Sequence, residues 1–299
     1  MPTALQELLT GLVDYAGLFP PAALGMPQAV REYAEHRAGE HAWMLGRFVL
    51  PASRLPEFEA AAGPLLPREP SQAWRLSVLA SADVEETVRL VGEFNCRRAE
   101  PGVGAAVADV LELKAASVGE IERLAPQLPA WLVAYVEVPV RDDPAPLIDA
   151  LARSRLRAKV RTGGVTADAF PSAKELARFI LACRRAGVPF KATAGLHHPL
   201  RGEYRLTYDA GSPSGTMFGF LNVFVAGIVA WFSARQDVVE AVLEERDPRA
   251  LVVEGFDIRW RGYSFHADDV GHVRERTGLA FGSCSFREPV DDLRALGYL

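Results

Sequence analysis

The sequence alternates short apolar segments, typical of buried β-strands, with longer amphipathic segments typical of α-helices. The strand candidates are Met44–Leu50, Trp74–Leu79, Asp109–Lys114, Trp131–Val138, Leu156–Arg161, Pro189–Thr193, Leu251–Ile258 and Leu279–Ser285. Strands and helices alternating in this way over about 250 residues predict a (β/α)8, TIM-barrel-like fold. The alternative is an open doubly wound α/β sheet, which usually has a glycine-rich loop after its first strand. Leu50-Pro51-Ala52-Ser53-Arg54 stands there instead.

The chain shows no internal repeat or low-complexity linker that would divide it. Residues 1–40 precede the first predicted strand, and we expect them to form an N-terminal helical extension packed on the barrel. Residues 41–299 then form a single catalytic domain. Ser172 and Gly187 mark the two ends of one predicted helix, as an N-cap and a C-terminal glycine.

Composition excludes several classes of protein. The hydrophobic fraction of 49% is ample for a buried core, and a net charge of −5 without a long basic run argues against nucleic acid as a partner. Cys96, Cys183 and Cys284 have neither metal-type nor disulfide-type spacing, which fits a reducing compartment. The N-terminus lacks the pattern of a signal peptide. We therefore expect a cytoplasmic protein.

One segment is apolar enough to raise the question of a membrane. Ala210–Ala234 carries no charge, and Met217–Phe232 is almost wholly apolar. Its apolar part is shorter than the ~20 residues that a span needs, and polar and small residues interrupt it. We predict no membrane span but a helix buried in the core or in a subunit interface, so the segment also suggests a homo-oligomer.

The most informative functional feature is a pair of lysines. Lys159 and Lys191 lie near the ends of two neighbouring predicted strands, and each strand runs into a loop rich in Thr and Gly. A helix separates the strands, so they should be parallel and bring both lysines to the same mouth of the sheet. A buried ammonium group is costly unless it is paired or has a chemical role.

Side chains alternate along a strand, so polar residues on one face stand out. We expect these polar faces to point into the barrel: Arg47, Glu112, Lys114, Tyr135, Glu137, Lys159, Arg161 and Lys191. Most lie toward the carboxyl ends of their strands, where barrel enzymes have their active sites. The alternative is a buried network of ion pairs that only fixes the strand register.

A buried lysine beside another cation can be neutral and nucleophilic, and can form a Schiff base with a carbonyl substrate. Lys159 has Arg161 on its own strand and Lys191 on the next. We therefore predict these lysines as catalytic, with Glu137 or Tyr135 as general acid or base.

The same cations can also bind an anion without covalent chemistry. Arg161 and a lysine can hold a carboxylate or phosphate, and Gly163 and Gly164 would let the backbone approach it. Tyr135 and Arg47 are further candidates for substrate binding.

The two lysine segments resemble those of class I deoxyribose-phosphate aldolases. The segments are Lys159-Val160-Arg161-Thr162-Gly163-Gly164 and Gly187-Val188-Pro189-Phe190-Lys191-Ala192-Thr193-Ala194-Gly195. In that family a Lys-Thr-Ser-Thr-Gly strand carries the Schiff-base lysine, and the next strand carries a second lysine. The resemblance implies that Lys159 forms the Schiff base with Lys191 as its partner. It covers Ala158–Gly195 and a few late residues, and these are our fifth and sixth strands rather than the family's sixth and seventh.

Two adjacent histidines follow the second of these strands. His197 is a candidate acid, base or substrate-binding group, and His198 is a candidate for substrate binding. Together with Glu137 they could alternatively bind a divalent metal, although no metal or other cofactor is favoured.

The segment Asp14–Ala22 combines an acid, two aromatic residues and a Pro-Pro pair. It could cover the mouth of the barrel as a lid that presents Asp14 or Tyr15 to a substrate. It could equally close the opposite end of the barrel as a hydrophobic plug.

The favoured function is that of a lyase of aldolase type acting on a small anionic carbonyl compound. The first alternative is a metal-dependent barrel enzyme that uses Glu137, His197 and His198. The second is a barrel without catalytic activity, which binds an anion or uses its charges only to stabilise the fold.

Overall fold

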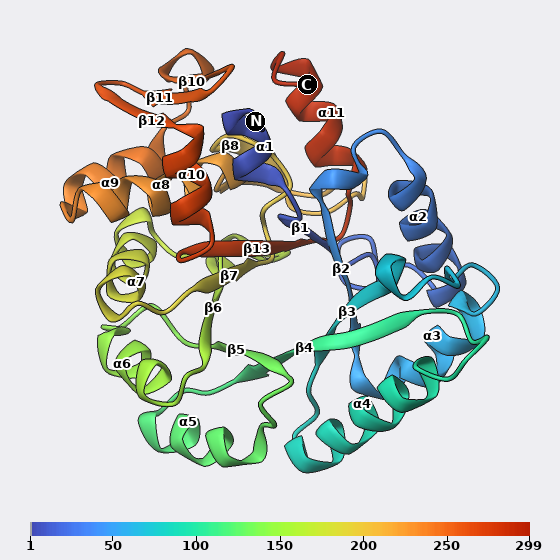
Figure 1. Ribbon diagram of the computed structural model, residues 1–299. Coiled ribbons are helices and arrows are strands. Elements are labelled where there is room, and N and C mark those ends of the chain that lie inside the picture. The colour runs from blue at the N-terminus through green and yellow to red at the C-terminus, as the bar shows by residue number, and fades with distance from the viewer. Residues whose placement is uncertain (1) are drawn as a thin grey trace.

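The structure is a computed structural model that describes residues 2–299. Eight parallel strands form a closed barrel in the order β1-β13-β7-β6-β5-β4-β3-β2, and helices surround it (Figure 1). The barrel strands are β1 (Val13–Tyr15), β2 (Leu45–Pro51), β3 (Trp74–Leu79), β4 (Ala106–Lys114), β5 (Val133–Glu137), β6 (Arg157–Arg161), β7 (Phe190–Thr193) and β13 (Gly278–Ser283). The predicted (β/α)8 barrel is confirmed.

The helices bury their apolar faces against the barrel strands and against one another. They are α1 (Ala4–Leu9), α2 (Met26–Ala38), α3 (Leu55–Ala62), α4 (Val84–Arg98), α5 (Val118–Leu124), α6 (Ala145–Arg153), α7 (Ala173–Ala186), α8 (Phe220–Phe232), α9 (Gln236–Glu244), α10 (Ala267–Arg274) and α11 (Arg287–Ala295). Ser172 and Glu175 form a capping box at the start of α7, and Gly187 ends it with a φ of 65°. The predicted caps of this helix are thus confirmed.

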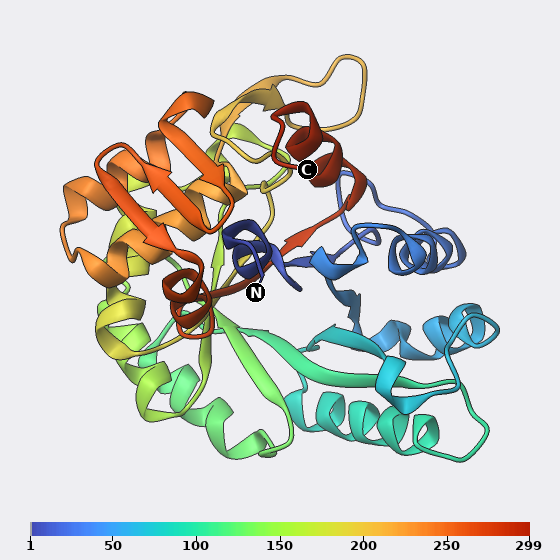
Figure 2. The same cartoon turned by 45° about the horizontal axis from the view of Figure 1, so that its top comes forward.

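The prediction of a barrel strand at Leu251–Ile258 is wrong. Gly255 has a φ of 56° and turns the chain, so that β10 (Leu251–Glu254) and β11 (Asp257–Trp260) form a hairpin. With β12 (Tyr263–His266) they make an antiparallel sheet of their own. Figure 2 shows this orange sheet outside the barrel, beside the helices that precede it.

The missing barrel strand is β1, which lies in the segment expected to be a helical extension. All three of its residues are buried, and it pairs with β13 on one side and β2 on the other. Residues 1–40 therefore contain part of the barrel as well as α1 and α2, and the domain boundary at residue 40 is corrected. A strand of three residues is too short to show a periodic pattern.

The uncharged helix α8 is a core helix. Eleven of its residues are buried, and it packs against α7, α9 and α10. Within residues 2–299, no helix combines the length and the apolar character that crossing a membrane requires. Because α8 is covered within the chain itself, it no longer supports the expectation of a homo-oligomer.

The buried side chain of Arg274 hydrogen-bonds to two segments that lie near opposite ends of the sequence. Its Nε donates to the carbonyl of Leu8 at 2.7 Å and its Nη2 to that of Thr10 at 3.4 Å, while Nη1 donates to the carbonyl of Gly278. Burial lowers the pKa of Arg274 to about 10, a value at which the side chain is still charged at neutral pH. The guanidinium thus holds the segment before β1 against the start of β13, where the barrel closes.

We predict that Arg274→Met lowers the free energy of unfolding by about 2–4 kcal/mol, because it leaves buried carbonyl groups without donors. Arg276→Met is the matched control, since Arg276 is half-exposed and bonds mainly within its own turn. Denaturation in urea checks both variants. Equal stability of the two would contradict this role of Arg274.

Candidate active site

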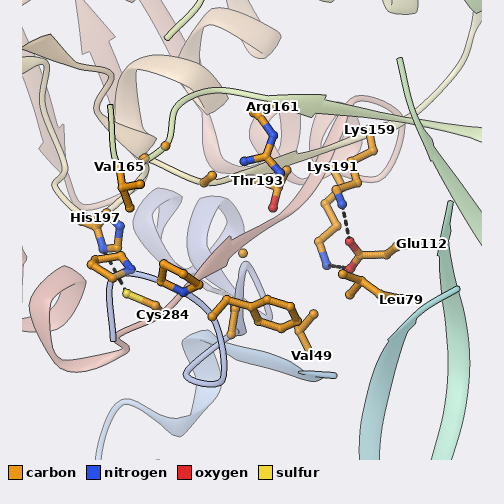
Figure 3. Close-up of a pocket in the computed structure, with 18 of the residues that line it drawn as sticks. Val49, Leu79, Glu112, Lys159, Arg161, Val165, Lys191, Thr193, His197 and Cys284 are labelled. Carbon is orange, nitrogen blue, oxygen red and sulfur yellow. Dashed lines mark hydrogen bonds and ion pairs between the residues drawn. The ribbon is translucent and has the colours of Figure 1, made fainter. Parts of the chain in front are cut away.

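A cavity of about 260 Å³ lies at the carboxyl ends of the barrel strands. Glu112 of β4, Lys159 of β6 and Lys191 of β7 line one side of it, and Cys284 and His197 line another (Figure 3). Much of the remaining wall is apolar. The cavity is large enough for a small organic molecule, and it occupies the part of the fold where barrel enzymes bind their substrates.

The two lysines share one carboxylate. Lys191 Nζ lies 2.5 Å from Glu112 Oε1 and 2.6 Å from Asp14 Oδ2. Lys159 Nζ lies 2.8 Å from Glu112 Oε2 and 3.0 Å from Glu137 Oε2. Lys159 and Lys191 are direct neighbours in the register of β6 and β7. The predicted convergence of the lysines is therefore observed, with Glu112 between them.

Pairing outweighs burial for the charges in this network. Burial alone would raise the pKa of Glu112, but Lys159 and Lys191 hold it well below its ordinary value. Burial would lower the pKa of Lys191, but Asp14 and Glu112 hold it well above its ordinary value. Lys191 is thus held in its charged form.

The two lysines are not held equally. The side chain of Lys191 is 1% exposed, and its partners Asp14 and Glu112 are 2% exposed. Lys159 has longer contacts, and its second partner Glu137 also faces Arg161 at 3.5 Å and Lys114 at 3.8 Å. Glu137 therefore divides its charge among three cations, whereas Asp14 holds Lys191 firmly.

The carboxylates are themselves held by other strands. Ser77 Oγ of β3 donates to Glu112 Oε1 at 2.6 Å, and the backbone N–H of Arg47 donates to Asp14 Oδ1 at 2.6 Å. Ser77 thus bonds the same oxygen of Glu112 that Lys191 contacts, whereas Arg47 holds the oxygen of Asp14 that Lys191 does not contact. The site is preorganised by contacts from β1, β2 and β3 as well as from the strands that carry the lysines.

The loops after β6 and β7 form the wall beside Lys159. Arg161, Thr193 and Gly164 line the cavity, as do Ala194 and Gly195. The last two have φ values of 63° and 70°, and a non-glycine residue in this region is a local strain of the kind found at binding sites. Arg161 and Gly164 are thus at the predicted position for binding an anion.

Gly163 has a packing role instead of the predicted role in binding. A Cβ atom at this position would overlap the ring of Phe170, and one at Gly195 would lie 2.8 Å from the Cα of Gly163. The two loops can approach each other only because both positions are glycine.

His197 lies at the opposite end of the cavity from the lysines (Figure 3). Its Nδ1 is 3.2 Å from Glu288 Oε2 and 4.0 Å from Cys284 Sγ. Burial opposes a charge on the imidazole, but hydrogen bonds to Cys284 and Glu288 raise the pKa of His197 to about 9. The predicted histidine is thus at the site, in a group with a thiol and a carboxylate.

Three residues predicted to bind the substrate, His198, Arg47 and Tyr135, do not line the cavity, and their predicted places are corrected. His198 Nδ1 is 2.6 Å from Asp292 Oδ2, and its ring stacks on Tyr204. Glu137, predicted as a catalytic residue, does not line the cavity either and reaches it only through its ion pair with Lys159.

Arg47 and Tyr135 lie at a different height in the barrel from the cavity, and Lys114, expected to point inward, points outward instead. The guanidinium of Arg47 pairs with Asp109 at 2.8 Å, and Tyr135 accepts a hydrogen bond from Arg157. Both lie toward the amino ends of the strands, where a charged layer stabilises the barrel. The side chain of Lys114, the last residue of β4, is 73% exposed.

The predicted metal ligands do not converge. Glu137 pairs with Lys159, His197 with Glu288 and His198 with Asp292. Among residues 2–299, no group of three or more His, Cys, Asp or Glu side chains is arranged to hold a metal ion.

The segment Asp14–Ala22 lies at the mouth of the barrel. Ala16, Phe19, Pro20 and Pro21 form part of the cavity wall, which agrees with a covering loop and not with a plug at the far end. Asp14, however, is in β1 and faces Lys191 rather than a substrate.

The amino-acid composition also draws attention to Lys159 and Lys191, in a way that the spacing of residues does not. Of its 33 basic residues only four are lysines, at positions 114, 159, 174 and 191. Arginine fills most exposed and ion-paired positions of this chain. Two of the four lysines occupy the same buried site.

The chain was compared with known proteins. No model of a protein family matches it, and no curated protein matches its sequence. The function must therefore be argued from the geometry of the cavity.

We predict that Glu112→Gln lowers the free energy of unfolding at pH 7 by about 3–5 kcal/mol, because two buried ammonium groups lose their shared partner. Glu57→Gln, which breaks an exposed pair with Arg54, should cost less than about 1 kcal/mol. Urea denaturation measures both effects.

The same variant has a predicted pH dependence. The folded pKa of Glu112 lies below its ordinary value of 4.5, so its stabilisation is complete above about pH 4.5 and is lost as the pH falls through the folded pKa. The stability of Glu112→Gln should therefore fall less steeply than wild type below pH 4.5. If the free energy of unfolding of the two proteins falls equally below pH 4.5, ionised Glu112 is not the source of this stabilisation.

Proposed function

We propose that the protein is an enzyme that makes or breaks a carbon–carbon bond in a small carbonyl compound bearing an anionic group, through a Schiff base on Lys159. The observation that carries the proposal is the unequal lysine pair in the cavity. Lys191 is held as a cation by Asp14 and Glu112 on the strand next to that of Lys159, and the two ammonium groups share the carboxylate of Glu112. A fixed neighbouring cation is one of the influences that leave a lysine neutral and nucleophilic.

The chemistry follows from this division of roles. The neutral nitrogen of Lys159 attacks the carbonyl carbon, and loss of water gives an iminium ion. As the bond between the α and β carbons breaks, its electron pair moves toward the iminium to give an enamine, while the hydroxyl on the β carbon loses its proton and becomes the carbonyl of the released aldehyde. Protonation of the enamine carbon and hydrolysis then free Lys159. Glu137 lies 3.0 Å from Lys159 Nζ and can carry the protons that these steps move, whereas Glu112 stays ionised between the two lysines. Arg161 and Thr193 line the cavity, and in this proposal they bind the anionic group of the substrate.

The position of the lysines in the barrel adds support. Because β1 precedes the strands recognised in the sequence, Lys159 and Lys191 lie on the sixth and seventh strands along the chain. These are the positions implied by the resemblance to class I deoxyribose-phosphate aldolases.

One observation favours the alternative of a barrel without catalytic activity. The cavity lysines are paired with carboxylates, as a purely structural network requires. The cavity beside Lys159 is the feature that this alternative leaves without a role.

We predict that borohydride in the presence of a small carbonyl compound, such as pyruvate or glyceraldehyde phosphate, attaches the reduced adduct to Lys159. Peptide mass spectrometry locates it among the four lysines. Lys159→Met should abolish the cavity adduct. Lys174→Met is the control, because Lys174 lies on the exposed face of α7.

Lys191→Met provides a second comparison. It should slow trapping on Lys159 by at least about tenfold, because the fixed cation is lost. If a panel of small aldehydes, ketones and keto acids labels Lys159 no faster than Lys174, the Schiff-base function is wrong.

A further inference from the structure

A second reactive group lies at the end of the cavity opposite the lysines. Cys284 follows β13, and its Sγ is 4.0 Å from His197 Nδ1, which in turn is 3.2 Å from Glu288 Oε2. The hydroxyl of Tyr208 donates to Glu288 at 2.8 Å and lies 3.5 Å from the sulfur. The lysine chemistry uses none of these four side chains.

A thiol and a carboxylate both face the same nitrogen of an imidazole here, Nδ1 of His197. Burial opposes a charge on His197, yet its hydrogen bonds to Cys284 and Glu288 raise its pKa to about 9, so the imidazole is protonated at neutral pH and Glu288 balances its charge. A thiol beside an imidazolium is one of the settings that activate a cysteine as a nucleophile. Three separate segments supply these residues: the loop after β7, the turn after β13 and the first turn of α11.

Cys284 has access to small molecules despite being only 6% exposed. It lines the cavity, and it also lines a second hollow of about 370 Å³ that it shares with His36 and Arg287. Cys183 differs, because it is sealed among apolar side chains of α7 and burial raises its pKa. Cys96 is exposed and has no such neighbours.

We propose that Cys284 is a second nucleophile of the cavity, which adds reversibly to the carbonyl carbon of an aldehyde bound there. The Sγ–C bond forms while the π electron pair of the carbonyl moves to oxygen. His197 gives a proton to that oxygen and receives the proton of the thiol, while Glu288 holds the imidazolium. The product is a thiohemiacetal, and the reverse steps release the aldehyde without any other reagent.

This inference rests on the proposed function only in taking the ligand to be a carbonyl compound, and it does not require the Schiff base. It gives the two ends of the cavity separate tasks. Lys159 activates one carbonyl compound, and Cys284 retains the aldehyde that is joined to it or released from it.

Iodoacetamide tests the nucleophile, since it forms an Sγ–C bond as iodide leaves. We expect Cys284 to be alkylated at least about tenfold faster than the exposed Cys96, with Cys183 unmodified, as read by peptide mass spectrometry. If Cys284 is only buried and not activated, the exposed Cys96 is alkylated faster than Cys284. A rate for Cys284 equal to or below that of Cys96 overturns the inference.

The role of His197 is tested by chemical rescue. His197→Gly should slow alkylation of Cys284 at least about tenfold, and added imidazole should restore the rate without changing that of Cys96. Glu288→Gln is the substitute if the glycine variant does not fold, and it should slow Cys284 in the same direction. An unchanged rate in the folded variant contradicts the proposed proton transfer.

The aldehyde is tested with propionaldehyde labelled with ¹³C at the carbonyl, in the Lys159→Met variant. We expect it to protect Cys284 but not Cys96 from iodoacetamide and to give a thiohemiacetal carbon signal, which Cys284→Ser removes. Absence of both effects overturns the inference. Because this variant lacks the proposed Schiff-base lysine, the result is independent of trapping on Lys159 in the wild-type protein.

Discussion

The site depends on one buried carboxylate, Glu112, which binds two ammonium groups from neighbouring strands. Removing three charges from water costs several kcal/mol for each, and only close pairing offsets it. Asp14 and Ser77 complete the arrangement, so five strands of the barrel meet through one set of polar contacts. The register of β6 and β7 places the lysines, and Glu112 keeps them there.

In our proposal, the unequal pairing of the two lysines is what gives this ion-pair network a catalytic role. Two equivalent lysines locked by carboxylates would only stabilise the barrel. Here Lys191 is held by two fully buried partners, whereas Lys159 shares Glu137 with Arg161 at the edge of the cavity. A charged lysine that cannot leave and a second one that faces a cavity are the ingredients of amine catalysis. The thiol of Cys284, our proposed second nucleophile, lies at the opposite end of the cavity.

The periodic patterns in the sequence correctly predicted those features that depend on long, regular strands and helices. The barrel and the meeting of Lys159 with Lys191 follow from parallel strands and alternating faces. The alternation of side chains shows which residues face into the barrel but not at which height the cavity lies. Arg47 and Tyr135 were therefore wrongly predicted to bind the substrate. Lys114 was expected to point inward, but as the last residue of its strand it is largely exposed.

Other features depend on contacts between distant loops. Asp14 was predicted in a lid because β1 is too short to be recognised, although it supplies a partner to Lys191. The grouping of Cys284 with His197 and Glu288 requires two turns at the mouth to meet, and no local pattern encodes this. The scarcity of lysine in an arginine-rich chain was the available signal that the two buried lysines have a specific role.

The central claim is that the two cavity lysines differ in reactivity. Limited carbamylation of the native protein with cyanate, which modifies uncharged amines, measures this difference at each of the four lysines by mass spectrometry. Our account predicts that Lys159 is carbamylated in the folded protein, while Lys191 stays unmodified until the protein is unfolded. Equal modification of the two, or protection of both until unfolding, would contradict it.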